Sequence, residues 1–322
     1  MVGWGVMGAS AHIAVGAVLP AIKNVERATL TAVASRRLDT AVEVGRAYGA
    51  DRCYGTYASL LRDPDVDVVY ICLPPALHVS WALECIGSGK SVVCEKPLGL
   101  SAREVDAVRN AASQTGVSVW EAFKPAFHPQ TRRVVEVLQS DRLGTLLEGD
   151  AEYSIALPRD GGFRWSNTMG GGALLDLGQY CLYPFIAAIG LPENIECASS
   201  VVGQSGVDEM TRAVIRYRGG LVVNVSVSFQ GPLRQSVEVR GTRRTMVGRF
   251  PWRPQDARCE VALVDGASGA SQFLPVCSAD PTQTMIESVS SALTSVGESP
   301  EPLKQTRALA SVIDEIRSIA MR

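Results

Sequence analysis

The fold is decided by a stretch at the start of the chain, which reads Val2-Gly3-Trp4-Gly5-Val6-Met7-Gly8-Ala9-Ser10. Residues 3–8 match the nucleotide-binding pattern G-x-G-x-x-G literally, but only two residues precede Gly3, and the pattern carries weight only between a strand and a helix. We therefore place a strand at Val2–Val6 and a turn at residues 5–10, followed by a helix with apolar positions from Ala14 onward. Backbone amides in such a turn can face a pyrophosphate, although a merely structural turn is an equal alternative.

Apolar runs of strand type alternate with helical patterns through the first part of the chain. The strand-type runs are Val2–Val6, Ala28–Ala34, Val66–Leu73, Ser91–Cys94 and Val117–Trp120. The helical patterns between them include Leu38–Tyr48, Leu77–Gly87 and Ala102–Thr115. Several of the strand-type runs are apolar nearly throughout, as strands covered on both faces of a parallel sheet are. The alternation predicts a doubly wound nucleotide-binding domain.

The end of the second predicted strand indicates which dinucleotide would bind. A domain that prefers NAD places Asp or Glu there for the ribose 2′-hydroxyl, whereas NADP needs cations and hydroxyls for the 2′-phosphate. Here the strand ends in Ser35-Arg36-Arg37, and the first carboxylate follows at Asp39. Arg36 could pair with a phosphate through its fork of donors, and Ser35 could donate once more. The pattern favours NADP(H), with ordinary surface arginines as the alternative.

Two further strand ends carry polar residues at the edge where ligands bind in doubly wound folds. The fourth strand runs into Leu73-Pro74-Pro75-Ala76-Leu77-His78, and the fifth runs into Cys94-Glu95-Lys96-Pro97. A lysine directly before a proline is held in an extended conformation, off any helix. Lys96 could therefore orient a carbonyl or hydroxyl group and lower the pKa of a neighbouring phenol. An isolated lysine is more often an ordinary surface residue.

The pattern changes near Phe123, and the length of 322 residues itself favours two domains. Strand-type runs follow near Thr145–Ala156 and at Ile195–Val202, Met210–Tyr217, Leu221–Phe229 and Arg234–Val239, with weaker runs to about Leu274. Short polar turns between them predict a large, mostly antiparallel open sheet with helices on one face. We expect an α/β chain with domains at 1–122 and 123–322. The last helix, at about 303–320, is expected to pack back toward the first domain.

The second domain contains a stretch that could handle protons, Gly170-Gly171-Gly172-Ala173-Leu174-Leu175-Asp176-Leu177-Gly178-Gln179-Tyr180. Three glycines give way to a helix-forming run. Because a helix has 3.6 residues per turn, Asp176 and Tyr180 lie on one face of it, one above the other. The alternative is a core helix whose tyrosine is buried and whose aspartate is a solvated charge in the first turn.

Composition excludes several classes of protein. The net charge is −2 with both signs mixed along the chain, which leaves no basic stripe for nucleic acid. The eight cysteines form no C-x-x-C pair and have no nearby histidine cluster, so we expect buried free thiols in a reducing compartment and no metal site. The chain has neither a long uninterrupted apolar stretch nor a leader-like amino terminus. We expect a soluble, cytoplasmic protein with no membrane partner.

Two widely separated motifs resemble those of the glucose-fructose oxidoreductase / inositol dehydrogenase / rhizopine catabolism (Gfo/Idh/MocA) family. They are Glu95-Lys96-Pro97 and the 170–180 stretch, in the family's order. Further matching positions are Gly5-Val6-Met7-Gly8, Ala34-Ser35-Arg36, Tyr70-Ile71-Cys72-Leu73-Pro74, His78, Glu121-Ala122-Phe123, His128-Pro129 and Gly206-Val207-Asp208-Glu209. The resemblance covers nearly the whole chain and implies a nucleotide-binding Rossmann domain followed by an α+β domain. Members of this family often form homo-oligomers, so we expect a dimer or tetramer joined through the open sheet face.

The resemblance also implies roles for particular residues. In this family the lysine of Glu-Lys-Pro binds substrate and cofactor, and the acid and the His or Tyr four residues later contribute to substrate binding and proton transfer. The implied catalytic residues are Lys96, Asp176 and Tyr180. The positions expected to bind the cofactor are Gly5, Met7, Gly8, Ala9, Ser10, Ser35, Arg36, Arg37, Leu73, Pro74, His78, Glu95 and Lys96. The weaker candidates for substrate contact are Phe123, His128 and Trp165.

The implied reaction is hydride transfer between NADP(H) and a carbinol or keto carbon of a sugar, sugar nucleotide or cyclic polyol. A tyrosine at position 180 resembles the branch that contains dihydrodiol dehydrogenases and sugar 3-ketoreductases, whose members mostly use NADP(H). Tyrosine has an ordinary pKa near 10, so it is suited to donate a proton during carbonyl reduction. We favour reduction of a keto-sugar, with a sugar or trans-dihydrodiol dehydrogenase as the alternative. The alternative from another functional class is a sensor protein that binds NADP(H) but catalyses no reaction.

The chain departs from the family pattern next to the second domain. The family usually has an arginine where Ala126 stands and often an aromatic residue where Pro125 stands. This stretch helps to form the substrate pocket in the family, so the Lys124-Pro125-Ala126 segment leaves the identity of the substrate open. The same departure supports the alternative of a cofactor-binding sensor.

Overall fold

The computed structural model describes residues 1–249, 260–295 and 303–321. Contacts between residues divide the chain into two compact units. Unit 1 consists of Met1–Lys124 and Asp280–Thr306, and unit 2 consists of Pro125–Ala279 and Arg307–Arg322. The second stretch of unit 1 comes from the part of the chain that the sequence analysis assigned to the second domain.

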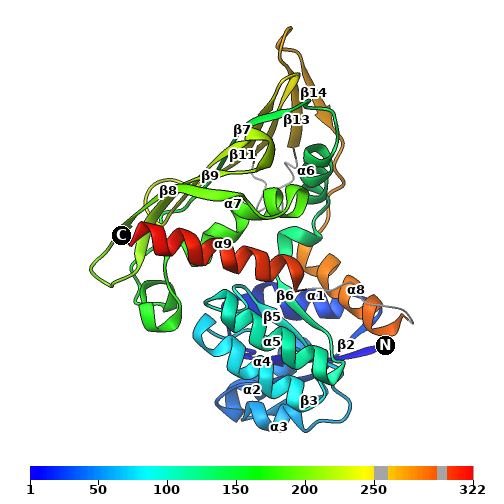
Figure 1. Cartoon of the computed structure of the whole chain (residues 1–322). Coiled ribbons are helices and arrows are strands. Elements are labelled where there is room, and N and C mark those ends of the chain that lie inside the picture. The colour runs from blue at the N-terminus through cyan, green and yellow to red at the C-terminus, as the bar shows by residue number, and fades with distance from the viewer. Residues whose placement is uncertain (250–259, 296–302, 322) are drawn as a thin grey trace. The chain divides into compact units, whose positions relative to one another are not determined.

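Unit 1 is built on a six-stranded parallel sheet with the order β3-β2-β1-β4-β5-β6. Figure 1 labels the strands β2, β3, β5 and β6 among the helices of the unit. Its strands are β1 (Val2–Met7), β2 (Ala28–Ala34), β3 (Arg52–Tyr54), β4 (Val68–Ile71), β5 (Ser91–Glu95) and β6 (Val119–Ala122). The strand order reverses between β1 and β4, which is the position where doubly wound sheets bind ligands beyond the carboxyl ends of their strands. The predicted doubly wound fold is confirmed. Gly3 and Gly5 lie inside β1, so the literal G-x-G-x-x-G match is not the turn.

Helices connect these strands. They are α1 (Leu19–Asn24), α2 (Leu38–Tyr48), α3 (Tyr57–Leu61), α4 (His78–Gly87) and α5 (Ala102–Thr115), and α8 (Pro281–Thr294) joins the unit from the later part of the chain. Because parallel crossovers are right-handed, the connections on the two sides of the switch point cover opposite faces of the sheet. The helix α8 packs against β1, where the buried Trp4 indole Nε1 donates a hydrogen bond to Ser290 Oγ at 3.1 Å. All of β1 is buried, as the sequence pattern predicted.

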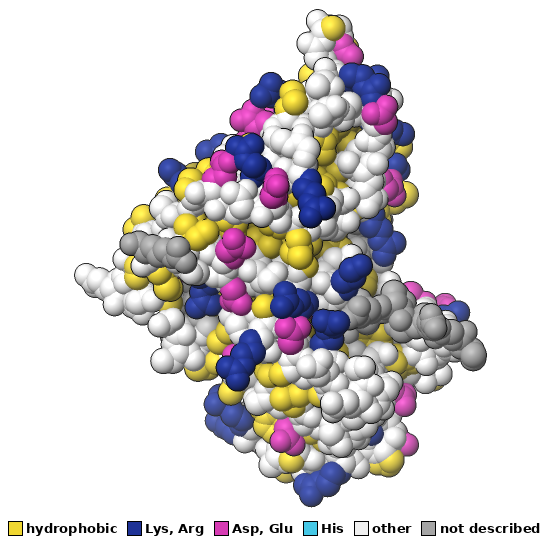
Figure 2. Space-filling model, in the orientation of Figure 1, with side chains coloured by type: hydrophobic (Ala, Val, Ile, Leu, Met, Phe, Trp, Pro, Cys, Tyr) yellow, Lys and Arg dark blue, Asp and Glu magenta, His cyan; other side chains and the backbone are white. Residues whose placement is uncertain are grey.

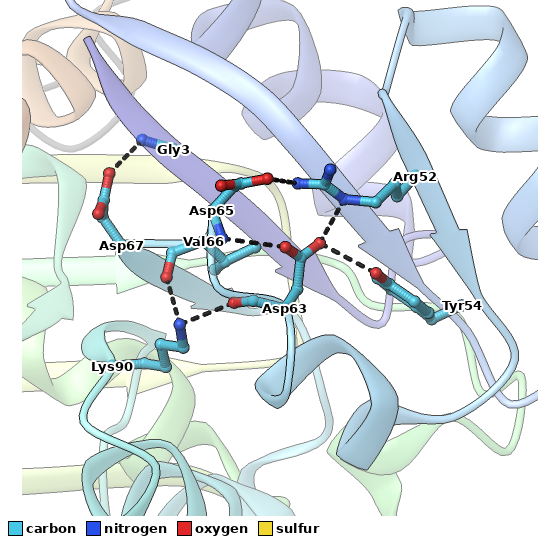
Figure 3. Close-up of polar contacts among 8 residues, drawn as sticks. All are labelled: Gly3, Arg52, Tyr54, Asp63, Asp65, Val66, Asp67 and Lys90. Carbon is cyan, nitrogen blue, oxygen red and sulfur yellow. Dashed lines mark hydrogen bonds and ion pairs between the residues drawn. The ribbon is translucent and has the colours of Figure 1, made fainter.

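A polar network stabilises the amino-terminal edge of this sheet (Figure 3). The Asp63 carboxylate, 3% exposed, accepts hydrogen bonds from Arg52 Nε at 2.7 Å and from the Tyr54 hydroxyl at 3.0 Å. The Lys90 ammonium donates to the carbonyl oxygens of Asp63 and Val66 at 2.8 and 2.7 Å. These bonds join the segments that enter β3, β4 and β5. The network therefore lies at the end of the sheet opposite to the expected ligand edge.

Unit 2 is built on an eight-stranded sheet with the order β14-β13-β12-β11-β7-β10-β9-β8. Its strands are β7 (Leu146–Ser154), β8 (Asn194–Val202), β9 (Asp208–Arg216), β10 (Val222–Ser228), β11 (Arg234–Gly241), β12 (Arg244–Arg249), β13 (Glu260–Asp265) and β14 (Ser271–Leu274). Neighbouring strands are antiparallel except for the parallel pair β7 and β10. The predicted large, mostly antiparallel sheet is confirmed.

The helices of unit 2 are α6 (Pro129–Gln139), α7 (Ala173–Ile189) and most of α9 (Lys304–Ala320). The helix α7 packs against β7, β9 and β10. On β10 the alternation of the sequence decides which face is covered: Val223, Val225 and Val227 are buried, whereas Asn224 and Ser226 on the other face keep partial exposure. The core of the unit therefore lies between the apolar face of the sheet and α7.

The surface carries both kinds of charge, as the composition indicates. On the face drawn in Figure 2, side chains of Lys and Arg are interspersed with those of Asp and Glu. Among the described cysteines, Cys72, Cys85, Cys94 and Cys181 are buried free thiols, Cys53 is half-buried, and Cys197 and Cys277 are exposed; Cys259 lies outside the described residues. No helix in the described ranges is long and apolar enough to cross a membrane.

Candidate active site

The turn after β1 is shaped for close approach of the backbone. Gly8 has a φ of +78°, and a Cβ added there would lie 2.5 Å from the carbonyl oxygen of Cys72, so only glycine suits the position. The N–H groups of Gly8 and Ala9 both donate to the Ala34 carbonyl, at 3.0 and 3.1 Å. These two amides therefore join β1 to β2, and the contact of this turn with a pyrophosphate stays a prediction. Ser10 is the exposed residue of the turn.

The end of β2 separates its two arginines. Ser35 is buried, and its N–H donates to the Tyr54 carbonyl at 3.1 Å. The Arg37 guanidinium pairs with Asp39, and hydrogen bonds from Arg37 lower the pKa of that carboxyl to about 2. Arg36 is exposed, and its side chain has no ion pair or hydrogen bond within the described residues. Arg36 therefore remains available to bind an anionic ligand, whereas Arg37 already neutralises Asp39, the nearest carboxylate.

His78 connects two backbone segments at the carboxyl edge of the unit 1 sheet. Its ring is buried, with Nδ1 2.7 Å from the Pro97 carbonyl oxygen and Nε2 2.7 Å from the Leu73 carbonyl oxygen. Burial lowers the pKa of His78, although the two carbonyl groups act in the opposite direction. Because both ring nitrogens contact backbone groups, His78 joins the loop after β4 to the peptide bond that follows Lys96. Leu73 and Pro74 are half-buried in the same loop.

The Glu-Lys-Pro segment follows β5. The Glu95 carboxylate accepts hydrogen bonds from the Tyr70 hydroxyl at 2.9 Å and from the Lys124 ammonium at 2.8 Å. Burial opposes the charge of Glu95, but the positive charge of Lys124 and these hydrogen bonds lower its pKa. Lys96 is half-buried beside it. Glu95 is thus held by side chains of unit 1, and Lys124 from the segment that departs from the family pattern provides the cation.

The helix α7 presents one accessible stripe. Between residues 170 and 182 only Asp176 and Tyr180 are partly exposed, and Tyr183 continues the stripe one turn later. Asp176 and Tyr180, which the i, i+4 spacing of the sequence predicts to share one helical face, are therefore both accessible on that face. Asp176 also lies in the first turn of the helix, where the helix dipole favours a negative charge.

The three glycines bring a neighbouring loop against the start of α7. The N–H groups of Gly171 and Gly172 donate to the carbonyl oxygens of Ser166 and Arg164, at 2.9 and 3.1 Å. A Cβ at Gly171 would lie 2.5 Å from the Arg164 carbonyl oxygen. Gly172 has a φ of +116°, and a Cβ there would lie 2.2 Å from Asp208 Oδ1. The glycines are thus needed for close packing on both sides of the helix terminus.

Asp208 and Arg164 contact the start of α7, and the sequence does not predict either contact. The Asp208 Oδ2 atom accepts a hydrogen bond from the Leu174 N–H at 2.8 Å and so caps α7. The Arg164 Nε donates to Asp176 Oδ2 at 2.7 Å, and the guanidinium lies 4.7 Å above the Phe163 ring. In the sequence, Asp208 is only one position of the matching segment Gly206-Val207-Asp208-Glu209, which predicts no cap for α7. Arg164 lies in a loop with no regular pattern, so the sequence held no signal for its pairing.

Tyr180 is partly exposed, whereas the three candidates for substrate contact are buried. The Tyr180 ring lies edge-on to Tyr153, with ring centroids 5.1 Å apart. Trp165 is buried, and its indole N–H donates to the Pro158 carbonyl at 2.8 Å. His128 is fully buried, and its Nδ1 accepts a hydrogen bond from the Gln130 N–H, which makes it the cap of α6. Phe123 is buried at the end of β6.

The structure therefore forms two groups of candidate residues, each within one unit. Unit 1 brings together the turn at Gly8, the strand end at Arg36 and the Glu95-Lys96-Pro97 segment at the carboxyl edge of its sheet. Unit 2 brings together Asp176, Tyr180 and Arg164. Among the described residues, no group of three or more His, Cys, Asp and Glu side chains could hold a metal ion.

Comparison with known proteins defines the class. Residues 1–123 match the family model described as oxidoreductase family, NAD-binding Rossmann fold, and residues 131–247 match the Gfo/Idh/MocA C-terminal domain. The chain belongs to the Gfo/Idh/MocA family of oxidoreductases and is an enzyme of that class.

Individual relatives resemble the chain over most of its length. An uncharacterised oxidoreductase of Rhizobium meliloti is 32% identical, over 100% of this chain and 98% of the relative. The trans-1,2-dihydrobenzene-1,2-diol dehydrogenase of Mus musculus is 33% identical, over 70% of this chain and 68% of the relative. A crystal structure of KijD10, a 3-ketoreductase from Actinomadura kijaniata in complex with NADP and TDP-benzene, has a TM-score of 0.91 at 26% identity and covers 99% of this chain and 97% of that chain.

Proposed function

We propose that this enzyme transfers a hydride between NADP(H) and a carbinol or keto carbon of a sugar, sugar nucleotide or cyclic polyol, and that reduction of a keto-sugar is its principal reaction. The observation that carries the proposal is the accessible stripe of α7, where Asp176 and Tyr180 are the only partly exposed side chains between residues 170 and 182. An acid and a phenol on one accessible helical face suit a substrate that has several hydroxyl groups and exchanges one proton.

Each residue of the group has a distinct part in the proposed reaction. Tyr180 donates the proton to the oxygen of the ketone, because a phenol is protonated at neutral pH. Asp176, paired with Arg164 at 2.7 Å, is an ionised acceptor that orients a substrate hydroxyl. Lys96 is the proposed binding residue for substrate and cofactor in unit 1. When bound, the nicotinamide supplies the hydride for reduction or accepts it in the reverse direction.

The residues at the carboxyl edge of the unit 1 sheet fit NADP(H). The positive φ at Gly8 lets the β1 turn approach the end of β4 closely, and Ser10 offers an exposed hydroxyl. At the end of β2, Arg36 provides an exposed guanidinium for a 2′-phosphate, and the nearest carboxylate, Asp39, pairs with Arg37. NADP bound to the structurally similar 3-ketoreductase supports the same choice. Unit 1 is thus the proposed cofactor-binding domain and unit 2 the proposed substrate-binding and oligomerisation domain.

Oxidation of NADPH against a panel of keto-sugars, sugar nucleotides and diketones tests the proposal, with NADH as the comparison. We expect turnover with at least one keto-sugar and a clear preference for NADPH. Tight binding of NADPH without turnover on any substrate, in either direction, would contradict catalysis and favour the sensor alternative.

A second candidate is oxidation of a vicinal diol or sugar. The similarity to a dihydrodiol dehydrogenase over 70% of the chain favours this candidate. The same site residues serve it, because Tyr180 then accepts the proton that it donates during reduction. Comparison of the reductive panel with NADP-dependent oxidation of cyclic diols and aldoses separates the two candidates.

A further inference from the structure

We propose that Arg164 is the positioning residue of this active site: it holds Asp176 as an ionised, oriented hydrogen-bond acceptor and provides a fixed positive charge for Tyr180 within the same unit. The inference rests on the proposed function of Tyr180 as the proton donor. It adds a cation that neither the motifs nor the family resemblance indicated.

The first support is the geometry of the ion pair. The Arg164 Nε atom donates to Asp176 Oδ2 at 2.7 Å, a short charge-assisted bond. The Asp176 side chain is 13% exposed and that of Arg164 is 39% exposed, so the carboxylate is largely removed from water while the guanidinium remains in contact with it. A carboxylate in this setting needs a cation to remain charged. Arg164 therefore provides the charge that makes Asp176 an acceptor.

The second support is the way in which the backbone holds Arg164. The carbonyl oxygen of Arg164 accepts a hydrogen bond from the Gly172 N–H at 3.1 Å and lies only 2.5 Å from the position that a Cβ of Gly171 would take. Below the guanidinium, the Phe163 ring centroid is 4.7 Å from Cζ. Backbone, ring and carboxylate thus constrain the same residue. The glycines that precede α7 serve this placement, because any side chain at position 171 would push the loop away.

The third support is electrostatic. Burial opposes the charge of Arg164, but the Asp176 carboxylate raises its pKa, and Tyr180 and Tyr153 contribute in the same direction. Interactions between charges are reciprocal, so the positive charge of Arg164 favours the phenolate that remains after Tyr180 has donated its proton. Asp176 and Tyr180 lie four residues apart on one helical face, so the Arg164–Asp176 pair lies about one turn of α7 from Tyr180.

Three variants separate this role from a merely structural one. Arg164→Gln removes the charge, and we expect kcat to fall about 10- to 100-fold and the pH profile of kcat to move upward by about one unit. Arg164→Lys retains the charge and should restore most of the profile but less of kcat, since it loses the planar fork. Arg159→Gln is the matched control: Arg159 pairs with Glu209 and lies 4.7 Å above the Trp165 ring, and its loss should leave the pH profile unchanged.

A readout that needs no substrate distinguishes failure of this inference from failure of the proposed function. Ultraviolet titration of tyrosinate, with Tyr180→Phe as the reference, follows the ionisation of Tyr180 alone. We expect its midpoint to rise in Arg164→Gln by about one unit and to stay near that of the wild type in Arg159→Gln. Circular dichroism confirms that each variant is folded, and Arg164→Lys provides a folded, charged alternative if the glutamine variant is not.

The outcomes divide clearly. Unchanged Tyr180 titration and an unchanged pH profile in folded Arg164→Gln would overturn the role of Arg164, whatever the substrate. A wild-type enzyme that reduces no ketone would overturn the proposed function, while the titration would still decide the role of Arg164.

Discussion

At the scale of single residues, neighbours decide what each charged side chain can do. Arg36 and Arg37 are adjacent in sequence, yet Arg37 pairs with Asp39 and Arg36 has no partner within the described residues. Arg159 and Arg164 lie in one loop, yet only Arg164 pairs with the accessible face of α7. The chemical role of these arginines therefore follows from their contacts and not from residue type.

We predict that Arg36→Ala lowers the preference for NADPH over NADH. Loss of the guanidinium removes the proposed contact to the 2′-phosphate, and a charge-assisted contact of this kind contributes roughly 1.5–3 kcal/mol, or about 10- to 150-fold in Kd. Titration of both cofactors by fluorescence measures the ratio. Arg62→Ala, which removes another exposed arginine of unit 1, is the control. An unchanged ratio of the two Kd values would show that Arg36 does not select the cofactor.

At the scale of elements, Lys124 stabilises the end of β5. Its ammonium lies 2.8 Å from Glu95 Oε1, and the two side chains are 17% and 12% exposed. We predict that Lys124→Met lowers the free energy of unfolding at neutral pH by about 3 kcal/mol, because it leaves a largely buried carboxylate without its cation. Lys124→Arg, which retains the charge, should recover much of the loss.

The pH dependence of this effect has a definite sign. The folded-state pKa of Glu95 lies below its ordinary value, so its ionised form stabilises the fold above the unfolded pKa, and this contribution is lost as the pH falls through the folded pKa. The difference between wild type and Lys124→Met should therefore shrink as the pH falls, because Glu95 becomes protonated in both proteins. Urea unfolding from neutral to acidic pH measures it. A constant difference across the series would contradict the ion-pair account.

The elements also show what could be predicted from sequence. Helical and strand periodicity are local, so the parallel sheet of unit 1 and the shared face of Asp176 and Tyr180 follow directly from spacing. The Arg164–Asp176 pair was not predictable, because it depends on a loop that approaches α7 only where Gly171 has no side chain. Likewise, the pattern after β1 indicated a turn but not that the Gly8 and Ala9 amides bond to β2.

At the scale of the whole molecule, the open face of the unit 2 sheet is the proposed interface with a second copy. It contains a hollow of about 360 Å³ that is lined by residues of β7 to β11. Side chains on this face pair across strands, as Arg240 does with Glu148 and Asn224 with Asp150. The exposed Arg212 lines this hollow from β9, the strand next to the edge strand β8.

We predict that Arg212→Glu shifts the protein toward the monomer. In a two-fold interface, the reversed charge faces either the same residue of the second copy or a residue that previously faced an arginine, and the second contact becomes less favourable. Light scattering coupled to size-exclusion chromatography measures the mass. Arg103→Glu, an equal reversal on α5 of unit 1, is the control and should leave the mass unchanged. If the wild-type protein is monomeric at all concentrations, the proposed interface is wrong.

The central claim is that the accessible face of α7 performs acid–base catalysis, and Tyr180→Phe tests it most directly. The variant removes only the phenolic hydroxyl, and Tyr183→Phe makes the same change one turn later on the same stripe as a control. We predict that kcat for NADPH-dependent keto-sugar reduction falls by about 10²- to 10⁴-fold in Tyr180→Phe, with the Kd for NADPH unchanged, while Tyr183→Phe stays near the wild type. A near-wild-type rate in folded Tyr180→Phe would contradict the assignment.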